Sequence, residues 1–321
     1  MLPSCEPFPK HLFVMTDYHF GIEIEVRAKP HKIRNPLSEK HALYYEKLAA
    51  ALRNRGLNAK ADDLTGRYGK HPEHYDKWWI TKDGSLGNPE ELIPMEAVSP
   101  ILSCRRNWED EIDTFWAAMR AVFHMPERSP RCGSHVHLSR GRGRAFSLSQ
   151  LKTIAYGIAI YEPLIASLLM TNRANNDYCK LNTQNSPQLR QCGLNGPAIA
   201  RLINSATNAE MLKDIMQNDR YVLWNFENIV PERSGTIEFR GGRCLRGEIR
   251  TKRWIAFTIA IVHAFLSMND LKHPEYVSIT SWSPEALYEA VKKCSGQLSM
   301  GNLIPDDYRV LNETVAYDTT G

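Results

Sequence analysis

The sequence lacks the spacing patterns that mark several common classes of protein. Its seven cysteines are an odd number and form no C-x-x-C pair, which argues against a zinc ribbon and against a disulfide framework. No apolar run reaches the ~18 residues of a membrane span, and the first residues lack the basic and apolar segments of a signal peptide. We therefore expect a cytoplasmic protein with no membrane partner, because unpaired cysteines suit a reducing compartment.

Glycine-rich phosphate-binding loops are also missing. Neither G-x-x-x-x-G-K-[ST] nor G-x-G-x-x-G after a strand occurs, which disfavours P-loop and Rossmann nucleotide binding. The net charge is only +4, from 40 basic and 36 acidic residues, so we expect no nucleic-acid partner. We interpret the basic stretch 140–144 as a solvated loop, with phosphate or substrate contact as the alternative.

Three short segments share a pattern that places two polar side chains on one face of a strand. Residues i and i+2 of a strand point to the same face, about 6.5–7 Å apart. The pairs are Glu23 and Glu25, His135 and His137, and Glu238 and Arg240. In each segment Ile, Val, Leu or Phe occupies the other face. One pair could be a solvated sheet face, but three such pairs predict strands that converge on a charged pocket.

These side chains suit a divalent cation. Buried carboxylates repel each other and need cations or protons nearby. Glu23, Glu25, Glu96 and Glu238 lie on predicted strands, and His135 adds one imidazole, a donor set that suits Mg²⁺ or Mn²⁺ better than zinc. Magnesium bound in this way usually completes its shell with water and substrate phosphates, which points to a nucleotide.

Strands and helices are predicted in mixed order. Strands are expected at 18–28, 77–81, 95–99 and 236–240, the last in a hairpin with 221–229. Helices are expected at 38–55 with Ser38 as the N-cap, at 107–123, at 148–171 with Ser147 as the N-cap, and at 248–268 and 284–294, with two short ones in 197–217. Loops are expected at 61–76 and 172–195. This order predicts an α+β fold with an antiparallel sheet, in one domain over 1–321 with a core of about 18–270 and a helical extension at 271–321.

Five motifs then occur in a recognisable order. They are FGIEIE, WWITKDGSLG, MEAVSP, CGSHVHLS, and RYVLWNFENIV followed by GTIEFR. In this order, over about residues 18–245, the chain resembles the amidoligase family of the carboxylate–amine ligase superfamily, which includes glutamine synthetase and glutamate–cysteine ligase. The resemblance implies a glutamine-synthetase-like antiparallel sheet, curved into a funnel and packed with helices, with metals and ATP phosphates inside.

The resemblance also implies which residues hold the metals. Glu23, His135 and Glu238 would share one Mg²⁺, while Glu25 and Glu96 would hold another. A further carboxylate near Glu96 is not evident in the sequence, so the number of metal ions stays open.

Other residues would contact the substrates. His137 would approach the transferred phosphate, and Arg240 the phosphate or the substrate carboxylate, with a structural salt bridge to a glutamate as the alternative for Arg240. The residues expected to face the substrate are Asp83, Ser85, Ser99 and Asn225. For Asp83 the alternative is the first position of a tight turn.

The predicted activity is ATP-dependent joining of a carboxylate to an amine, on an amino acid, a peptide or a small metabolite. A carboxylate is a poor acyl donor, so ATP would convert it to an acyl phosphate that the amine attacks, with His137 or a carboxylate as base. The alternatives are a metal-dependent hydrolase of amide or phosphate bonds and a non-catalytic nucleotide-binding relative. Cys132 is interpreted as a small buried side chain and not as a nucleophile.

Overall fold

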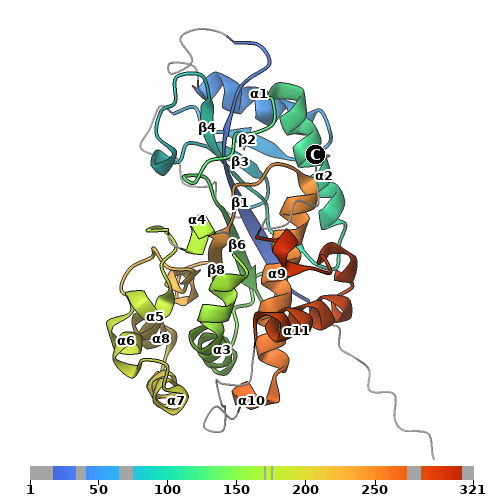
Figure 1. The fold of residues 1–321 in the computed structure, drawn as a ribbon. Coiled ribbons are helices and arrows are strands. Elements are labelled where there is room, and N and C mark those ends of the chain that lie inside the picture. The colour runs from blue at the N-terminus through green and yellow to red at the C-terminus, as the bar shows by residue number, and fades with distance from the viewer. Residues whose placement is uncertain are drawn as a thin grey trace, which may run out of the picture.

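One mixed β-sheet organises the protein. The computed structural model describes residues 17–33, 41–64, 75–169, 171–174, 176–272 and 283–312. Over these residues the sheet has eight strands in the order β2-β3-β4-β1-β6-β8-β7, with β5 paired to β1 (Figure 1). The strands are β1 (His19–Ala28), β2 (Ala59–Ala61), β3 (Trp78–Thr81), β4 (Ile93–Val98), β5 (Leu102–Ser103), β6 (Ser134–Ser139), β7 (Trp224–Asn225) and β8 (Ile237–Gly242).

The prediction of an antiparallel sheet is wrong at one edge. Strands β2 and β3 run parallel, whereas β1, β4, β6, β7 and β8 pair antiparallel with their neighbours. A parallel pair needs a crossover of about a dozen residues, and 62–77 separate these two strands. Strand β2 was missed because three residues are too few to show alternation.

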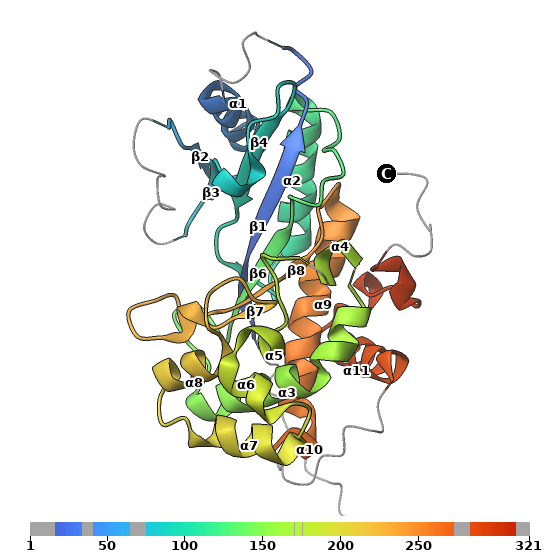
Figure 2. The ribbon, with the colours of Figure 1, turned by 60° about the vertical axis from the view of Figure 1, so that its left-hand side comes forward.

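Helices of very different lengths surround the sheet (Figures 1 and 2). The longer ones are α1 (His41–Arg53), α2 (Trp108–Val122), α3 (Leu148–Ser167), α7 (Gly196–Ser205), α8 (Ala209–Met216), α9 (Glu248–Ser267) and α11 (Pro284–Gln297). The short ones are α4 (Thr171–Ala174), α5 (Asn182–Asn185), α6 (Pro187–Cys192) and α10 (Asn269–Lys272). The 3₁₀ turns are η2 (Gly84–Leu86), η3 (Glu227–Ile229), η6 (Gly301–Leu303) and η7 (Tyr308–Val310).

The apolar face of the sheet packs against α2 and α9. Phe20 on β1 meets Trp108 edge to face, with ring centroids 5.4 Å apart. On the same face of the sheet, the ring centroid of Phe239 on β8 lies 6.0 Å from that of Trp254 and 6.2 Å from that of Phe257, both on α9. Because strand residues alternate, this packing directs the polar residues of the same strands to the opposite face.

Local signals explain where several helices begin and end. Ser147 caps α3, as the sequence predicts, and the structure shows that it forms a capping box with Gln150. At the end of α1, Gly56 has φ +86°, and the N–H of Leu57 donates to the Leu52 carbonyl, which closes the helix. The predicted cap at Ser38 lies outside the described residues.

The prediction of a loop over 172–195 is wrong, because this stretch contains α4, α5 and α6. Helices of four to six residues are too short to show apolar periodicity, although one start signal was present: Ser186 accepts a hydrogen bond from the N–H of Leu189, and Pro187 is the first helical residue. The helix predicted over 148–171 ends at Ser167, and α4 begins at Thr171.

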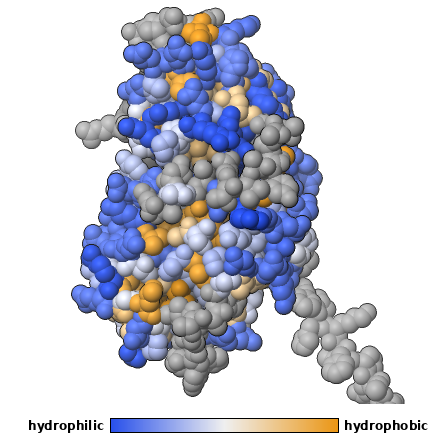
Figure 3. Space-filling view, in the orientation of Figure 1, coloured by the Kyte–Doolittle hydropathy of each residue, from blue (hydrophilic) through white to orange (hydrophobic). Residues whose placement is uncertain are grey.

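On the face drawn in Figure 3, the apolar residues of the described part of the chain lie mainly in the lower half, among hydrophilic ones. Isolated apolar residues on a surface are ordinary. Among the described helices, none combines the length and the apolarity that a bilayer crossing requires.

Close packing between α3 and α9 gives a stability prediction. A Cβ at Gly157 would lie 2.7 Å from Cγ of Phe265, whereas a Cβ at Gly296 in α11 would meet nothing within 4 Å. We expect Gly157→Ala to lower the free energy of unfolding by about 1–3 kcal/mol through overpacking. Gly296→Ala, the matched control, should raise it by about 0.5–1 kcal/mol. Urea unfolding measures both, and equal effects would contradict the packing.

Candidate active site

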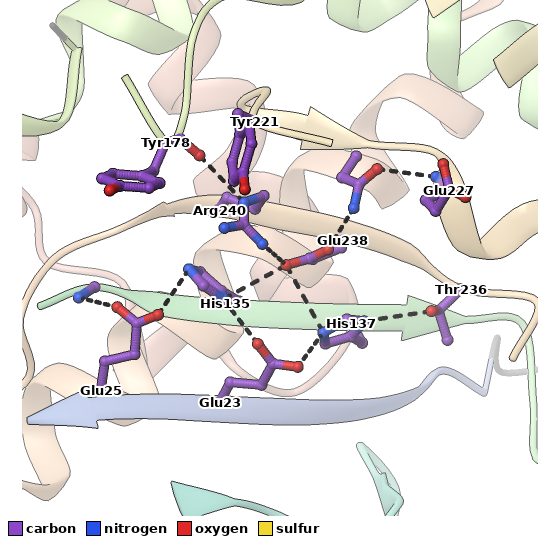
Figure 4. Close-up of polar contacts among 12 residues, drawn as sticks. Glu23, Glu25, His135, His137, Tyr178, Tyr221, Glu227, Thr236, Glu238 and Arg240 are labelled. Atoms are coloured by element: carbon purple, nitrogen blue, oxygen red, sulfur yellow. Dashed lines mark hydrogen bonds and ion pairs between the residues drawn. The ribbon is translucent and has the colours of Figure 1, made fainter. Parts of the chain in front are cut away.

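The strand register brings the predicted polar pairs together on one face of the sheet. Neighbouring strands pair Glu25 with Glu96, Glu23 with His135, and His137 with Glu238. Figure 4 shows the side chains of β1, β6 and β8 turned toward one another across this face. The alternation in the sequence predicted that the two residues of each pair share a face. The register of the strands places the three pairs next to one another.

Glu23 binds both histidines of β6. Its two carboxylate oxygens lie 2.8 Å from Nδ1 of His135 and 2.9 Å from Nε2 of His137. Burial opposes ionisation of Glu23, but the two imidazoles outweigh burial and hold its pKa well below the usual range. Burial also opposes charge on His137, yet Glu23 and Glu238 raise the pKa of His137 to about 9.

Glu238 is the most constrained carboxylate of the group. Its Oε1 accepts from Nη1 of Arg240 at 2.5 Å and lies 3.5 Å from Nδ1 of His135. Its Oε2 accepts from Nδ2 of Asn225 at 2.7 Å. Burial works against ionisation, but His137 and Arg240 lower the pKa of Glu238. The carboxylate is therefore charged and fixed in place at neutral pH.

A second acidic group lies on the β3–β4 side of the same face. Ligand atoms of Glu25, Asp83 and Glu96 lie within 4.8 Å of one another. The N–H of Gly133 donates to Oε2 of Glu25 at 2.7 Å, and His135 Nε2 is 3.7 Å from its Oε1. Asp83 comes from the turn after β3, where it also caps η2 by accepting from the N–H of Ser85 at 2.6 Å.

Burial and mutual repulsion disfavour the charged forms of Glu25 and Glu96 in the second group. Burial, followed by the charges of Glu23, Glu25, Asp83 and Glu238, raises the pKa of Glu96 well above its usual range. Burial also raises the pKa of Glu25. A divalent cation would relieve this repulsion, so the carboxylates of the second group fit a metal.

The first group offers a matching set of donors. Ligand atoms of Glu23, His135 and Glu238 lie within 4.8 Å of one another. The two groups together present carboxylate oxygens and one imidazole, which suit Mg²⁺ or Mn²⁺. Asp83 supplies the carboxylate near Glu96 that was not evident in the sequence, because its place depends on the turn after β3.

The remaining predicted residues have more local roles in the structure. The Ser99 hydroxyl accepts from the N–H of Ile22 and donates to the Pro100 carbonyl, both at 2.9 Å. Asn225 holds Glu238, and its Oδ1 accepts from Gln217 Nε2 at 2.8 Å. Substrate contact by Ser85, Ser99 and Asn225 stays a prediction.

Residues that sequence reasoning missed lie around Arg240. The backbone carbonyl of Arg240 accepts a hydrogen bond from Nη2 of buried Arg173 on α4, at 2.6 Å. The side-chain Nε of Arg240 donates to the Tyr178 carbonyl at 3.2 Å. The rings of Tyr178 and Tyr221 meet edge to face beside it, 5.6 Å apart (Figure 4). Arg173 and Tyr178 belong to the stretch 172–195, whose function had no readable signal.

A buried polar chain connects α3 to this face. Glu162, fully buried, accepts from the N–H groups of Asn182 and Thr183 and so fixes the start of α5. The Asn182 side chain in turn bonds both backbone groups of Trp224, at 2.8 and 3.0 Å. Trp224 precedes Asn225, so this series of hydrogen bonds helps to position the Asn225 side-chain amide that donates to Glu238.

Fold and site together define an α+β protein whose sheet presents, on one face, two groups of side chains that could hold a cation. A family model described as "Putative amidoligase enzyme" matches residues 16–262, well over half of the chain, and includes every residue of both groups. The chain belongs to this family, as its motifs predicted, and membership suggests a ligase-type enzyme. No curated protein sequence matches it.

The two groups predict two separable cation sites. We expect the protein to bind two Mn²⁺ ions, and Asp83→Asn to weaken one of them by roughly tenfold or more. Asparagine keeps the oxygen that caps η2 but removes the charge. Glu238→Gln should weaken the other ion. Titration monitored by the electron paramagnetic resonance of free Mn²⁺ measures both.

Glu91→Gln is the matched control for these Mn²⁺ titrations, because Glu91 is an exposed carboxylate paired with Lys29. Asp83→Asn binding indistinguishable from that of this control would refute the second site.

Glu162 predicts a pH dependence of stability. Burial raises its pKa to about 7, so between about pH 4.5 and 7 the native state holds the proton more tightly than the unfolded chain. The contribution of Glu162 is therefore greatest at low pH and is lost as the pH rises through 7. We expect the difference in unfolding free energy between wild type and Glu162→Gln to fall by about 2–4 kcal/mol across this window. Urea unfolding at several pH values tests this, and a constant difference would contradict it.

Proposed function

We propose that the protein is an ATP- and Mg²⁺-dependent ligase that joins a carboxylate to an amine through an acyl phosphate. The observation that carries the proposal is the meeting of two groups of possible metal ligands with Arg240 on one sheet face. Family membership supports the ligase class. The proposal includes the predicted funnel, whose wall would be this face of the sheet.

The reaction requires that negative charge on the phosphates and the carboxylate be offset, and it requires no protein nucleophile. The γ-phosphoryl group of ATP moves to the carboxylate, the amine then attacks the acyl carbon, and phosphate leaves. When bound, Mg²⁺ would offset negative charge on the phosphates and the carboxylate. Glu23, His135 and Glu238 would hold one ion, and Glu25, Asp83 and Glu96 the other.

Arg240 would clamp the transferring phosphoryl group. Among the described contacts it donates from Nη1 to Glu238 and from Nε to Tyr178, which leaves Nη2 for an anionic oxygen. Arginine forms strong charge-assisted hydrogen bonds with phosphate. The exposed rings of Tyr178 and Tyr221 beside it would offer a stacking surface to the nucleobase.

His137 fits a phosphate contact better than a base. With a pKa of about 9 it carries a proton at neutral pH, and a protonated imidazole donates to anions and accepts no proton. The proton lost by the amine would therefore go to a carboxylate of the site.

The proposal predicts nucleotide-dependent amide formation. Purified protein with ATP, Mg²⁺ and mixed amino acids, peptides and amines should release ADP and phosphate together with a dehydrated adduct, detected by mass spectrometry. Glu23→Ala and Glu238→Ala should each lower the rate by about 100-fold or more. Glu91→Gln, which leaves both groups intact, should keep wild-type activity.

Three outcomes would contradict the proposal. Activity that survives both alanine substitutions would remove the assigned site. Hydrolysis without nucleotide by a zinc-containing protein would favour a metallohydrolase. Tight binding of ADP and Mg²⁺ with no product from any substrate would favour a non-catalytic relative.

A further inference from the structure

Two cysteines face each other where the pairing of β6 and β8 ends. Ser134 lies opposite Gly242, so the antiparallel register continued by two residues places Cys132 opposite Cys244. Their thiols share a hydrogen bond. Directly opposite residues have Cβ atoms about 4.5–5.5 Å apart, only slightly beyond the span of a disulfide. A small movement would therefore allow the two sulfurs to bond.

The two thiols differ in accessibility. Cys132 is fully buried, whereas Cys244 is half-buried and reaches solvent. When protonated, the Cys244 thiol donates to the Glu127 carbonyl at 3.4 Å, which fixes it beside the segment that carries Cys132.

The two thiols also differ in acidity. The hydrogen bond donated by Cys132, with help from the charges of Arg243 and Arg246, lowers the pKa of Cys244. The same hydrogen bond, together with burial, raises the pKa of Cys132. Cys244 is thus the thiol that ionises first, and thiolates are the reactive form.

We propose that Cys132 and Cys244 form a reversible disulfide by exchange with a small-molecule disulfide such as oxidised glutathione. The Cys244 thiolate attacks one glutathione sulfur, which forms a mixed disulfide and releases glutathione thiolate. Cys132 passes its proton to the released thiolate and attacks Cys244 Sγ, which expels the second glutathione as a thiolate that takes up a proton from water. Two protein thiols are oxidised, and one glutathione disulfide is reduced to two thiols.

The modification would act on the sheet face described above. Cys132 is joined to β6 through Gly133, whose N–H holds Glu25. A cross-link to Cys244 would fix the register of β6 against β8, the strands that carry His135 and Glu238. The disulfide itself does not depend on the proposed ligase activity, so the two can be tested separately.

Peptide mapping of the full chain tests the disulfide. Reduced protein incubated with oxidised glutathione should lose two thiols and yield one cross-linked peptide pair that contains Cys132 and Cys244. Dithiothreitol should reverse both changes. Cys132→Ser should instead accumulate glutathione on Cys244, because no thiol resolves the mixed disulfide, and Cys244→Ser should leave Cys132 unmodified.

Cys192→Ser is the matched control, since Cys192 on α6 is also half-buried. It should form the Cys132–Cys244 link as wild type does. The proposal is overturned if wild type keeps its thiols or links other cysteines. It is equally overturned if Cys132 takes up glutathione at an undiminished rate in Cys244→Ser.

Discussion

Repulsion among five carboxylates on one sheet face is the constraint on which the rest of the structure depends. Three come from the central strands and one from β4, and Asp83 is brought in by the turn after β3. Such a gathering persists only where a rigid frame holds the strands together. Aromatic packing of α2 and α9 under the opposite face provides that frame, so the apolar core and the charged face are two sides of the same alternating strands.

The protein relieves this repulsion unevenly. On the β6–β8 side, two histidines, Arg240 and Asn225 surround Glu23 and Glu238, and both carboxylates are held in the charged form. On the β3–β4 side, burial and the charges of neighbouring carboxylates raise the pKa of Glu96. Cationic partners thus stabilise the charges of Glu23 and Glu238, whereas the charge of Glu96 is disfavoured. Such a site suits a cation and an anionic substrate that bind together.

What the sequence could predict followed from local rules. Alternation in β1, β6 and β8 identified the polar pairs, and the cap at Ser147 located the start of α3. Register and turns are set by tertiary packing, so the grouping of Asp83 with Glu25 could not be predicted. The short helices between 171 and 192, and with them Arg173, were missed because periodicity needs more turns than they have.

The central claim is that the two groups of side chains hold two divalent cations beside a nucleotide. Anomalous diffraction from crystals grown with Mn²⁺ and a non-hydrolysable ATP analogue tests it most directly. The account predicts one manganese peak among Glu23, His135 and Glu238, and a second among Glu25, Asp83 and Glu96. Crystals with bound nucleotide but no peak at either group, or with manganese only elsewhere, would contradict it.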